Sequence, residues 1–131
     1  MSRVSITRLR LRRFIFEFPF AWHALRSNLQ AREADGCLAI TARRHRGAYW
    51  TLTVWRDEAA LRGFMMAGAH RKAMSKLSSW CDEASVGHWE QDGAALPSWP
   101  VAEDRMAREG RLSAVKHPSP AQAAGKILGS N

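Results

Sequence analysis

One segment constrains the fold of this chain more than any other, a strand hairpin that leads directly into a helix. Residues 37–44 and 48–55 are rich in β-branched and aromatic side chains, and the short connection at 45–47 predicts that they pair as an antiparallel hairpin. Asp57 then stands where a helix N-cap is expected, because its carboxylate can accept hydrogen bonds from the free N–H groups of a first turn. This segment therefore predicts a layered structure of strands and helices.

Six segments of the chain have the periodicity of regular secondary structure. In order, they are a strand at 3–11, a helix at 19–32, the hairpin strands at 37–44 and 48–55, a helix from Asp57 to Cys81, and a strand at 84–90. Gly68 is expected to bend or interrupt the second helix. The apolar phase of the first strand shifts between Ile6 and Leu9, which predicts a bulge or a change of neighbouring strand. The order of elements predicts an α+β, ferredoxin-like βαββαβ fold, in which a four-stranded antiparallel sheet carries two helices on one face.

This fold does not specify what covers the second face of the sheet or where the C-terminal residues lie. A second copy of the subunit is the simplest cover for the open face, so a homodimer is expected. Residues 1–92 are assigned to the α+β domain, and residues 93–131 are expected to extend the same domain. The extension is predicted to contain a linker at 93–100, a short helix at 101–108, an added strand at 111–115, and a tail at 121–131 that is loose or lies across a partner.

The chain carries a strong excess of positive charge. There are 20 Lys and Arg residues against 12 Asp and Glu residues, which gives a formal net charge of +8. Such a charge favours association with nucleic acid, an anionic surface or a negatively charged ligand. No helix-turn-helix, zinc-finger or RNA-binding signature organises the basic residues, so a nucleic-acid partner is disfavoured and kept only as a third alternative.

Length and cysteine content favour a single cytoplasmic domain. A chain of 131 residues is long enough to bury one core without a metal or a disulfide. Cys37 and Cys81 have neither a second pair nor metal-ligand spacing, which favours a reducing compartment. Arg12-Arg13 resembles the start of an export signal, but Glu17 interrupts the apolar stretch that such a signal needs. No apolar run approaches the roughly 18 residues of a membrane helix, so no membrane span is expected.

Two segments resemble a known superfamily. Residues 50–64, WTLTVWRDEAALRGF, and residues 68–74, GAHRKAM, resemble the dimeric α/β-barrel superfamily, in the branch of spheroidene monooxygenase-like proteins and near the antibiotic biosynthesis monooxygenases. The resemblance implies a monooxygenase-like oxidoreductase. It also implies a pocket in each subunit, between the sheet and the two helices, where relatives hold an aromatic or polyene substrate, or haem.

Seven residues of this chain are candidates for lining that pocket. They are Trp22, His23, Trp50, Trp55, Phe64, His70 and Trp89. His70 is the candidate catalytic residue, as a base, and no metal ligands are expected. The tryptophans have the plainer interpretation of core or dimer-interface anchors, and His70 that of a buried histidine bonded to the backbone. Trp50 and Trp55 lie on opposite faces of one strand, so the seven cannot all face the pocket.

Two functions are favoured over the nucleic-acid alternative at this point. The first is a monooxygenase-like enzyme that acts on a hydrophobic or aromatic small molecule, and the second is a non-catalytic protein of the same fold that binds a small molecule or a partner. Oxygenation without a cofactor is favoured, with haem as the alternative. Haem-degrading relatives carry an axial histidine where Met74 stands here and a tryptophan where Phe64 stands, which argues against haem degradation of that type. Motifs for zinc, nucleotides and serine hydrolysis are missing from the sequence.

Overall fold

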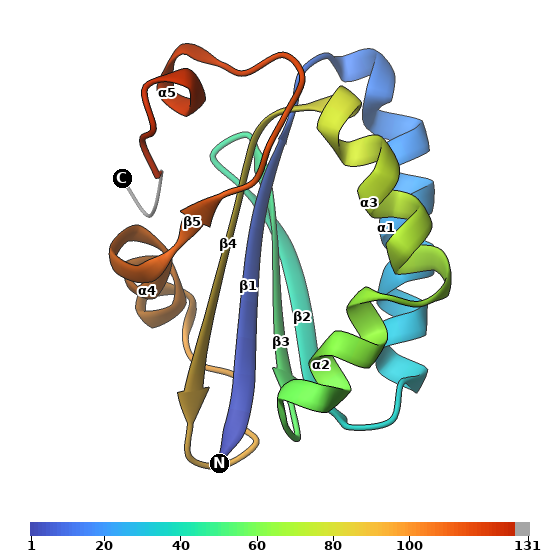
Figure 1. Ribbon diagram of the computed structural model, residues 1–131, viewed down its shortest axis with the longest axis vertical. Helices are drawn as coiled ribbons and strands as arrows, with labels where there is room; N and C mark the ends of the chain where they lie inside the picture. The colour runs from blue at the N-terminus through green and yellow to red at the C-terminus, as the bar shows by residue number, and fades with distance from the viewer. Residues whose placement is uncertain (128–131) are drawn as a thin grey trace.

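The computed structural model describes residues 1–127, apart from the side chain of Ala69 (Figure 1). In chain order the elements are strand β1 (Ser2–Leu11), 3-10 helix η1 (Phe14–Phe16), helix α1 (Glu17–Glu33), strands β2 (Cys37–His45) and β3 (Ala48–Trp55), helices α2 (Glu58–Met65) and α3 (Gly68–Trp80), strand β4 (Cys81–Gln91), helix α4 (Trp99–Glu109), strand β5 (Arg111–Leu112) and helix α5 (Pro120–Ala123). The α+β class with an antiparallel sheet is confirmed. The sheet has five strands in the order β2-β3-β1-β4-β5 rather than the four predicted, because β5 pairs with β4 as the added strand expected near residue 111.

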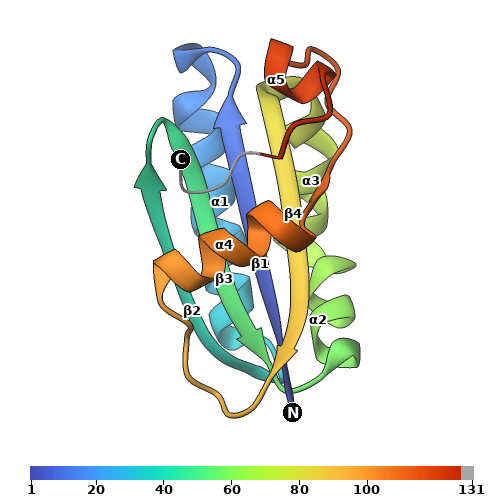
Figure 2. The same ribbon diagram turned by 90° about the vertical axis from the view of Figure 1, so that its left-hand side faces the viewer.

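Helices cover both faces of the sheet. Helices α1, α2 and α3 lie on one face, and α4 crosses the strands on the other face (Figures 1 and 2). The prediction that a second copy covers this second face is wrong for its central strands, because a helix of the same chain lies there. The reason is that α4 presents Ala102 and Met106, one turn apart and both fully buried, to the sheet.

The layer between the sheet and α4 is closely packed. Its buried cluster contains Val4, Ile6, Ala48, Trp50, Leu52, Val54, Trp89, Ala102 and Met106. Gly87 of β4 lies in this layer. A Cβ atom there would lie 3.2 Å from Cγ2 of Ile6 and 3.7 Å from Cα of Gly110, the C-cap residue of α4. A larger residue at Gly87 would therefore crowd the contact between β4 and the C-terminal end of α4.

A buried ion pair explains the irregular pattern of the first strand. Arg8 occupies a position in the row of β1 that faces α4, where Nη1 donates to Oε1 of Glu83 at 2.8 Å. The other carboxylate oxygen of Glu83 accepts a hydrogen bond from Oγ of Ser119 at 2.6 Å. The expected bulge between Ile6 and Leu9 is wrong, since β1 pairs with β3 in regular register through both residues. The alternation of apolar residues is interrupted at Arg8, because a paired charged side chain stands there in place of an apolar one.

Element boundaries differ from the predictions at a few places. Gly68 interrupts the second helical segment as expected, with φ at +54°, and α3 begins there. Cys81 belongs to β4 rather than to the preceding helix, so the strand begins earlier than predicted. The predicted tail at 121–131 contains part of α5, and residues 128–131 lie outside the described part of the chain. None of the helices within residues 1–127 has the length and hydropathy needed to cross a bilayer.

Candidate functional site

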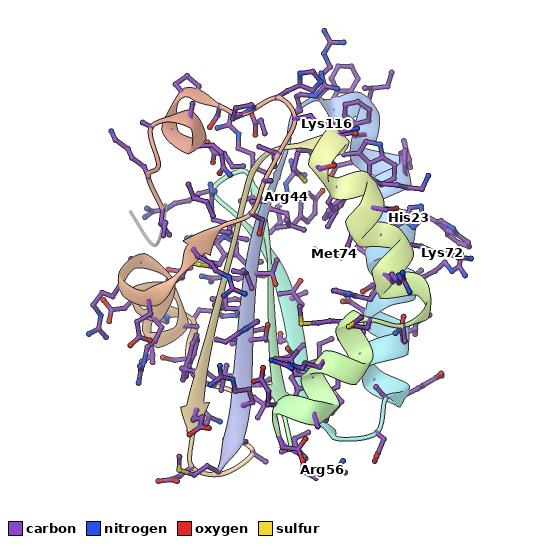
Figure 3. All side chains as sticks on the ribbon, in the orientation of Figure 1. His23, Arg44, Arg56, Lys72, Met74 and Lys116 are labelled. Carbon is purple, nitrogen blue, oxygen red and sulfur yellow. The ribbon has the colours of Figure 1, made fainter. Side chains whose placement is uncertain are left out.

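A cavity of about 460 Å³ lies between the sheet and the helices, on the face opposite to α4. Strands β1, β3 and β4 contribute most of its floor, and α1, α2 and α3 form its roof. Figure 3 shows the side chains of both layers around this space, with the labelled Met74 coming from α3. The volume is typical of small-molecule sites, which span roughly 300–1,000 Å³.

The floor of the cavity carries hydroxyl groups among apolar side chains, and its roof is mainly apolar. Four hydroxyl side chains on the two central strands line the floor: Ser5, Thr7, Thr51 and Thr53. Apolar side chains of the helices line the roof, among them Phe20, Ala24, Phe64, Met74 and Leu77. The hydroxyl groups follow from strand alternation, because Val4 and Ile6 of β1 and Leu52 of β3 point to α4 and the residues next to them point to the cavity. The lining fits a ligand with an apolar body and hydrogen-bonding groups along one edge.

His70 lines the cavity from the first turn of α3. Its position depends on Gln30 of α1, whose Oε1 accepts the backbone N–H of His70 at 2.9 Å and whose Nε2 donates to the carbonyl of Ala67 at 2.8 Å. The imidazole ring contacts Phe64, with 4.4 Å between ring centroids. A single side chain on α1 therefore holds the break between α2 and α3 and orients the histidine.

The imidazole of His70 is prepared to act as a base. Burial lowers the pKa of His70, and a hydrogen bond to the carbonyl of Met65 opposes this in part. In the neutral ring, Nδ1–H donates to that carbonyl at 3.3 Å, so the lone pair is on Nε2. Within residues 1–127, Nε2 of His70 has no hydrogen-bond partner. The ring is thus uncharged at neutral pH and has a free acceptor.

His88 is a site residue that the sequence-based candidates omitted. It lines the cavity from β4, and its Nε2 atom is buried without a hydrogen-bond partner in the described part of the chain. Burial lowers the pKa of His88, and the positive charges of Arg111 and Arg3 lower it further. Strand alternation already places His88 on the opposite face from Trp89, which is the signal that could have identified it. A buried polar atom without a partner is a natural contact for a ligand.

His23 also borders the cavity, from the middle of α1. Its ring lies 5.4 Å from the ring of Trp80, between ring centroids. Burial lowers the pKa of His23, and the positive charges of Lys76, Arg26 and Lys72 lower it further. His23 therefore lies where the cavity lining meets a positively charged outer surface.

The predicted pocket tryptophans do not line this cavity. Trp50 and Trp89 are buried on the other face of the sheet, against α4, and Trp22 is 58% exposed on the outside of α1. Trp55 is buried on the cavity side, where its ring stacks on Phe64 at 5.0 Å between centroids. Of the seven candidates, His23, Phe64 and His70 line the cavity, while Trp55 stacks against Phe64.

The described residues offer little for metal or thiol chemistry. No group of three or more His, Cys, Asp or Glu side chains within residues 1–127 is placed to hold a metal ion. Cys81 is fully buried, and burial, reinforced by the charge of Asp82, raises its pKa to about 12. Its thiol is therefore protonated at neutral pH, which disfavours it as a nucleophile. Histidine imidazoles and hydroxyl groups are the reactive side chains of the cavity.

Residues 20–114, which include most of the cavity lining, match a family described as a domain of unknown function, DUF3291. The chain belongs to the DUF3291 family. Among curated protein sequences, none shows significant similarity to this DUF3291 chain.

Solved structures similar to this DUF3291 chain share its fold at low sequence identity. Rv0793 from Mycobacterium tuberculosis is 14% identical, with a TM-score of 0.65, over 72% of this chain and 100% of its own. A cofactor-independent oxygenase from Streptomyces nogalater, SnoaB, is 18% identical, with a TM-score of 0.58, over 74% of this chain and 98% of its own. An antibiotic biosynthesis monooxygenase is 14% identical, with a TM-score of 0.61, over 71% of this chain and 100% of its own. The resemblance to antibiotic biosynthesis monooxygenases is confirmed at the level of the fold.

Proposed function

We propose that this protein is a monooxygenase-like enzyme that oxidises a hydrophobic or aromatic small molecule in the cavity between the sheet and the helices. The observation that carries this proposal is the state of His70, a half-buried neutral imidazole in the cavity lining whose Nδ1–H donates to the carbonyl of Met65 and whose Nε2 has no partner within residues 1–127. Such a group can remove a proton from a bound substrate. The shared fold with a cofactor-independent oxygenase supports the same class of reaction.

The reaction needs no co-reactant other than oxygen. In the proposed scheme, Nε2 of His70 removes a proton from an activated methylene group of the substrate, and the resulting carbanion passes electrons to O₂. Carbon–oxygen bond formation, followed by loss of water, converts the methylene to a carbonyl: CH₂ and O₂ give C=O and H₂O. The substrate supplies all four electrons. The hydroxyl group of Thr51 stabilises the developing oxyanion, and the apolar roof excludes water.

Haem is the alternative cofactor that the resemblance implies. If haem bound in the cavity, His70 would supply a nitrogen ligand for the iron and Arg111 a cation for the propionates, both from the cavity lining. Haem would contribute activation of oxygen at its iron. An absorption spectrum recorded after haem addition tests this directly, since a stoichiometric Soret band lost in His70→Ala would favour haem over the cofactor-free reaction.

The proposed base is tested with anthrone, whose methylene group is acidic and whose anion is rich in electrons. Wild-type protein should consume oxygen and produce the quinone, and His70→Ala should lower the rate about a hundredfold or more. The rate should fall on acidification through the lowered pKa of His70, because protonation removes the base. His117→Ala, which removes an exposed imidazole distant in sequence, is the matched control and should keep the full rate. Full activity of His70→Ala would remove His70 from the mechanism.

A non-catalytic binding protein of the same fold is the second candidate. The observation that favours it is the cavity itself, which has the size and mixed lining of a ligand site whether or not chemistry follows. Native mass spectrometry of the purified protein would detect a ligand retained from the cell. Tight binding of such a ligand, with no turnover under oxygen, would favour this candidate.

The homodimer and the cytoplasmic location also remain proposals. Because α4 covers the central part of the sheet face that a second copy was expected to cover, a dimer needs another surface. The outer edge of β2 is one such surface, since β2 pairs only with β3 within the described part of the chain. A monomeric mass at micromolar concentration would contradict the homodimer.

A further inference from the structure

The outer side of α1 carries a row of exposed apolar side chains. Phe18, Trp22, Leu25 and Leu29 are spaced by four, three and four residues, and they are 88%, 58%, 53% and 50% exposed. Phe14 of η1, 91% exposed, extends the row at its N-terminal end. We call these five residues the α1 stripe. A contiguous row of large apolar side chains on a surface marks an interaction site.

The stripe is not part of the packing that holds α1 to the sheet. The opposite side of the helix provides Phe20 and Ala31, both buried, and Ala24, which lines the cavity. Helix α1 is therefore apolar on two sides. The inner side packs against the rest of the domain, whereas no other element within residues 1–127 covers the outer side.

Positive charge flanks the stripe. Arg26 of α1 and Lys72 and Lys76 of α3 are all exposed and act electrostatically on the same histidine, His23, which follows Trp22 in the chain. Figure 3 shows Lys72 on the outer side of α3, directed away from the sheet. Helix α3 contains no acidic residue.

The acidic residues of α1 do not neutralise this charge. They are Glu17 and Glu33, at the two ends of the helix, and Glu17 is bonded to Tyr49 and Arg44. The outer surface of α1 and α3 is thus both apolar and basic.

We propose that the α1 stripe and its flanking cations bind the surface of an anionic lipid membrane. The large apolar side chains would enter the boundary between headgroups and acyl chains, while Arg26, Lys72 and Lys76 would contact lipid phosphates. A second copy of this chain fits this face less well, because its basic flanks would meet the same basic flanks. Nucleic acid offers phosphates but no apolar layer for Phe18 and Leu25. The proposal is independent of the proposed function, since it uses no residue of the proposed catalytic step.

The experiment is co-sedimentation with vesicles of two compositions, phosphatidylcholine alone and phosphatidylcholine mixed with phosphatidylserine. Wild-type protein should bind the mixed vesicles, bind pure phosphatidylcholine far more weakly, and release from the mixed vesicles as salt is added. Trp22→Ser combined with Phe18→Ser should weaken binding roughly tenfold or more, since two large apolar side chains are lost. Lys72→Glu should weaken it about tenfold.

Two matched controls separate this surface from general effects. Val101→Ser removes an apolar side chain that is 53% exposed on α4, and Lys126→Glu makes the same charge change beyond α5. Both should bind like the wild type. Thermal unfolding of each variant checks that the fold is kept.

Three outcomes would overturn the proposal. The first is equal binding to both vesicle types, and the second is binding that the stripe variants leave unchanged. The third is a stable dimer that Trp22→Ser dissociates, which would assign the stripe to a second copy of the chain.

Discussion

On the α4 side of the sheet the large side chains are almost completely shielded from solvent, whereas the other side encloses a cavity. Trp50, Leu52 and Met106 are at most 1% exposed in the α4-side cluster. On the cavity side, the same two central strands present serine and threonine to a space of about 460 Å³. The comparison indicates a division of roles, in which one face supplies stability and the other, less completely filled face supplies a binding site.

The difference arises from the residues that face each helix layer. Gly87 lets the C-terminal end of α4 lie close to β4, since a Cβ there would be 3.7 Å from Cα of Gly110. The helices of the other layer are held at a distance by larger groups, including Phe64 stacked on Trp55 at the α2 end. Because of this division of roles, the loss of stability caused by a substitution depends on the face where the substitution is made.

The largest expected effect is the loss of a large side chain from the packed face. Trp50→Ala should lower the free energy of unfolding by about 3–5 kcal/mol, because the neighbouring side chains cannot collapse into the space. Leu77→Ala, at the cavity, should lower it by only about 1 kcal/mol, since Leu77 is half-buried and borders empty space. Urea denaturation of both variants measures the difference. Equal losses would mean that the two faces contribute alike to stability.

The next effect concerns the ion pair that extends the packed face. Glu83→Gln should cost about 3 kcal/mol of stability, because Arg8 would then be buried without its counter-charge. Burial raises the pKa of Glu83, but the hydrogen bond from Ser119 and the interactions with Arg8 and Arg10 outweigh it and keep this pKa below its ordinary value.

The sign of the accompanying pH effect follows from that lowered pKa. The stabilisation by ionised Glu83 is fully present above the ordinary pKa of a glutamate and is lost as the pH falls through the lowered value. The wild type should therefore lose stability on acidification more steeply than Glu83→Gln. Glu90→Gln, an exposed site on the same strand, is the control and should follow the wild type. Parallel acid profiles for wild type and Glu83→Gln would contradict the assignment.

The smallest expected effect tests the tight packing at the C-terminal end of α4. A Cβ at position 110 would lie 2.6 Å from Sδ of Met106, so Gly110→Ala should destabilise the protein by about 1–3 kcal/mol. At Gly63, inside α2, a Cβ would meet no atom within 4 Å among the described residues. Gly63→Ala should therefore stabilise by about 0.5–1 kcal/mol, through helix propensity. Thermal or urea unfolding measures the sign of both changes, and a neutral Gly110→Ala would show that the C-terminal end of α4 can adjust without loss of stability.

Much of the secondary structure could be predicted because it rests on local periodicity. The hairpin at 37–55, the N-cap at Asp57 and the break at Gly68 each depend on residues that are neighbours in the chain. The cap shows this clearly, since the carboxylate of Asp57 accepts the N–H of Ala60 at 2.8 Å. His70 was a site candidate for the same reason, because it stands among apolar residues at helical spacing.

The candidate site was predicted less completely than the elements. Alternation along the strands indicates which residues share a face, but not which helices cover that face. Trp50 and Trp89 were therefore candidates for a pocket, although they lie against α4. His88 and the hydroxyl floor were missed, because a histidine or threonine on a strand gives no local sign of the space in front of it.

The sequence by itself determined the order of the elements, the two faces of each strand, and the excess of positive charge. Only the tertiary structure decided that α4 covers one face, that Arg8 is paired with Glu83, and that a cavity remains on the other face. Periodicity is a property of neighbouring residues, so a sequence displays it directly. The pairing of Arg8 with a residue 75 positions away, and the distance between two layers, depend on how all the side chains pack together.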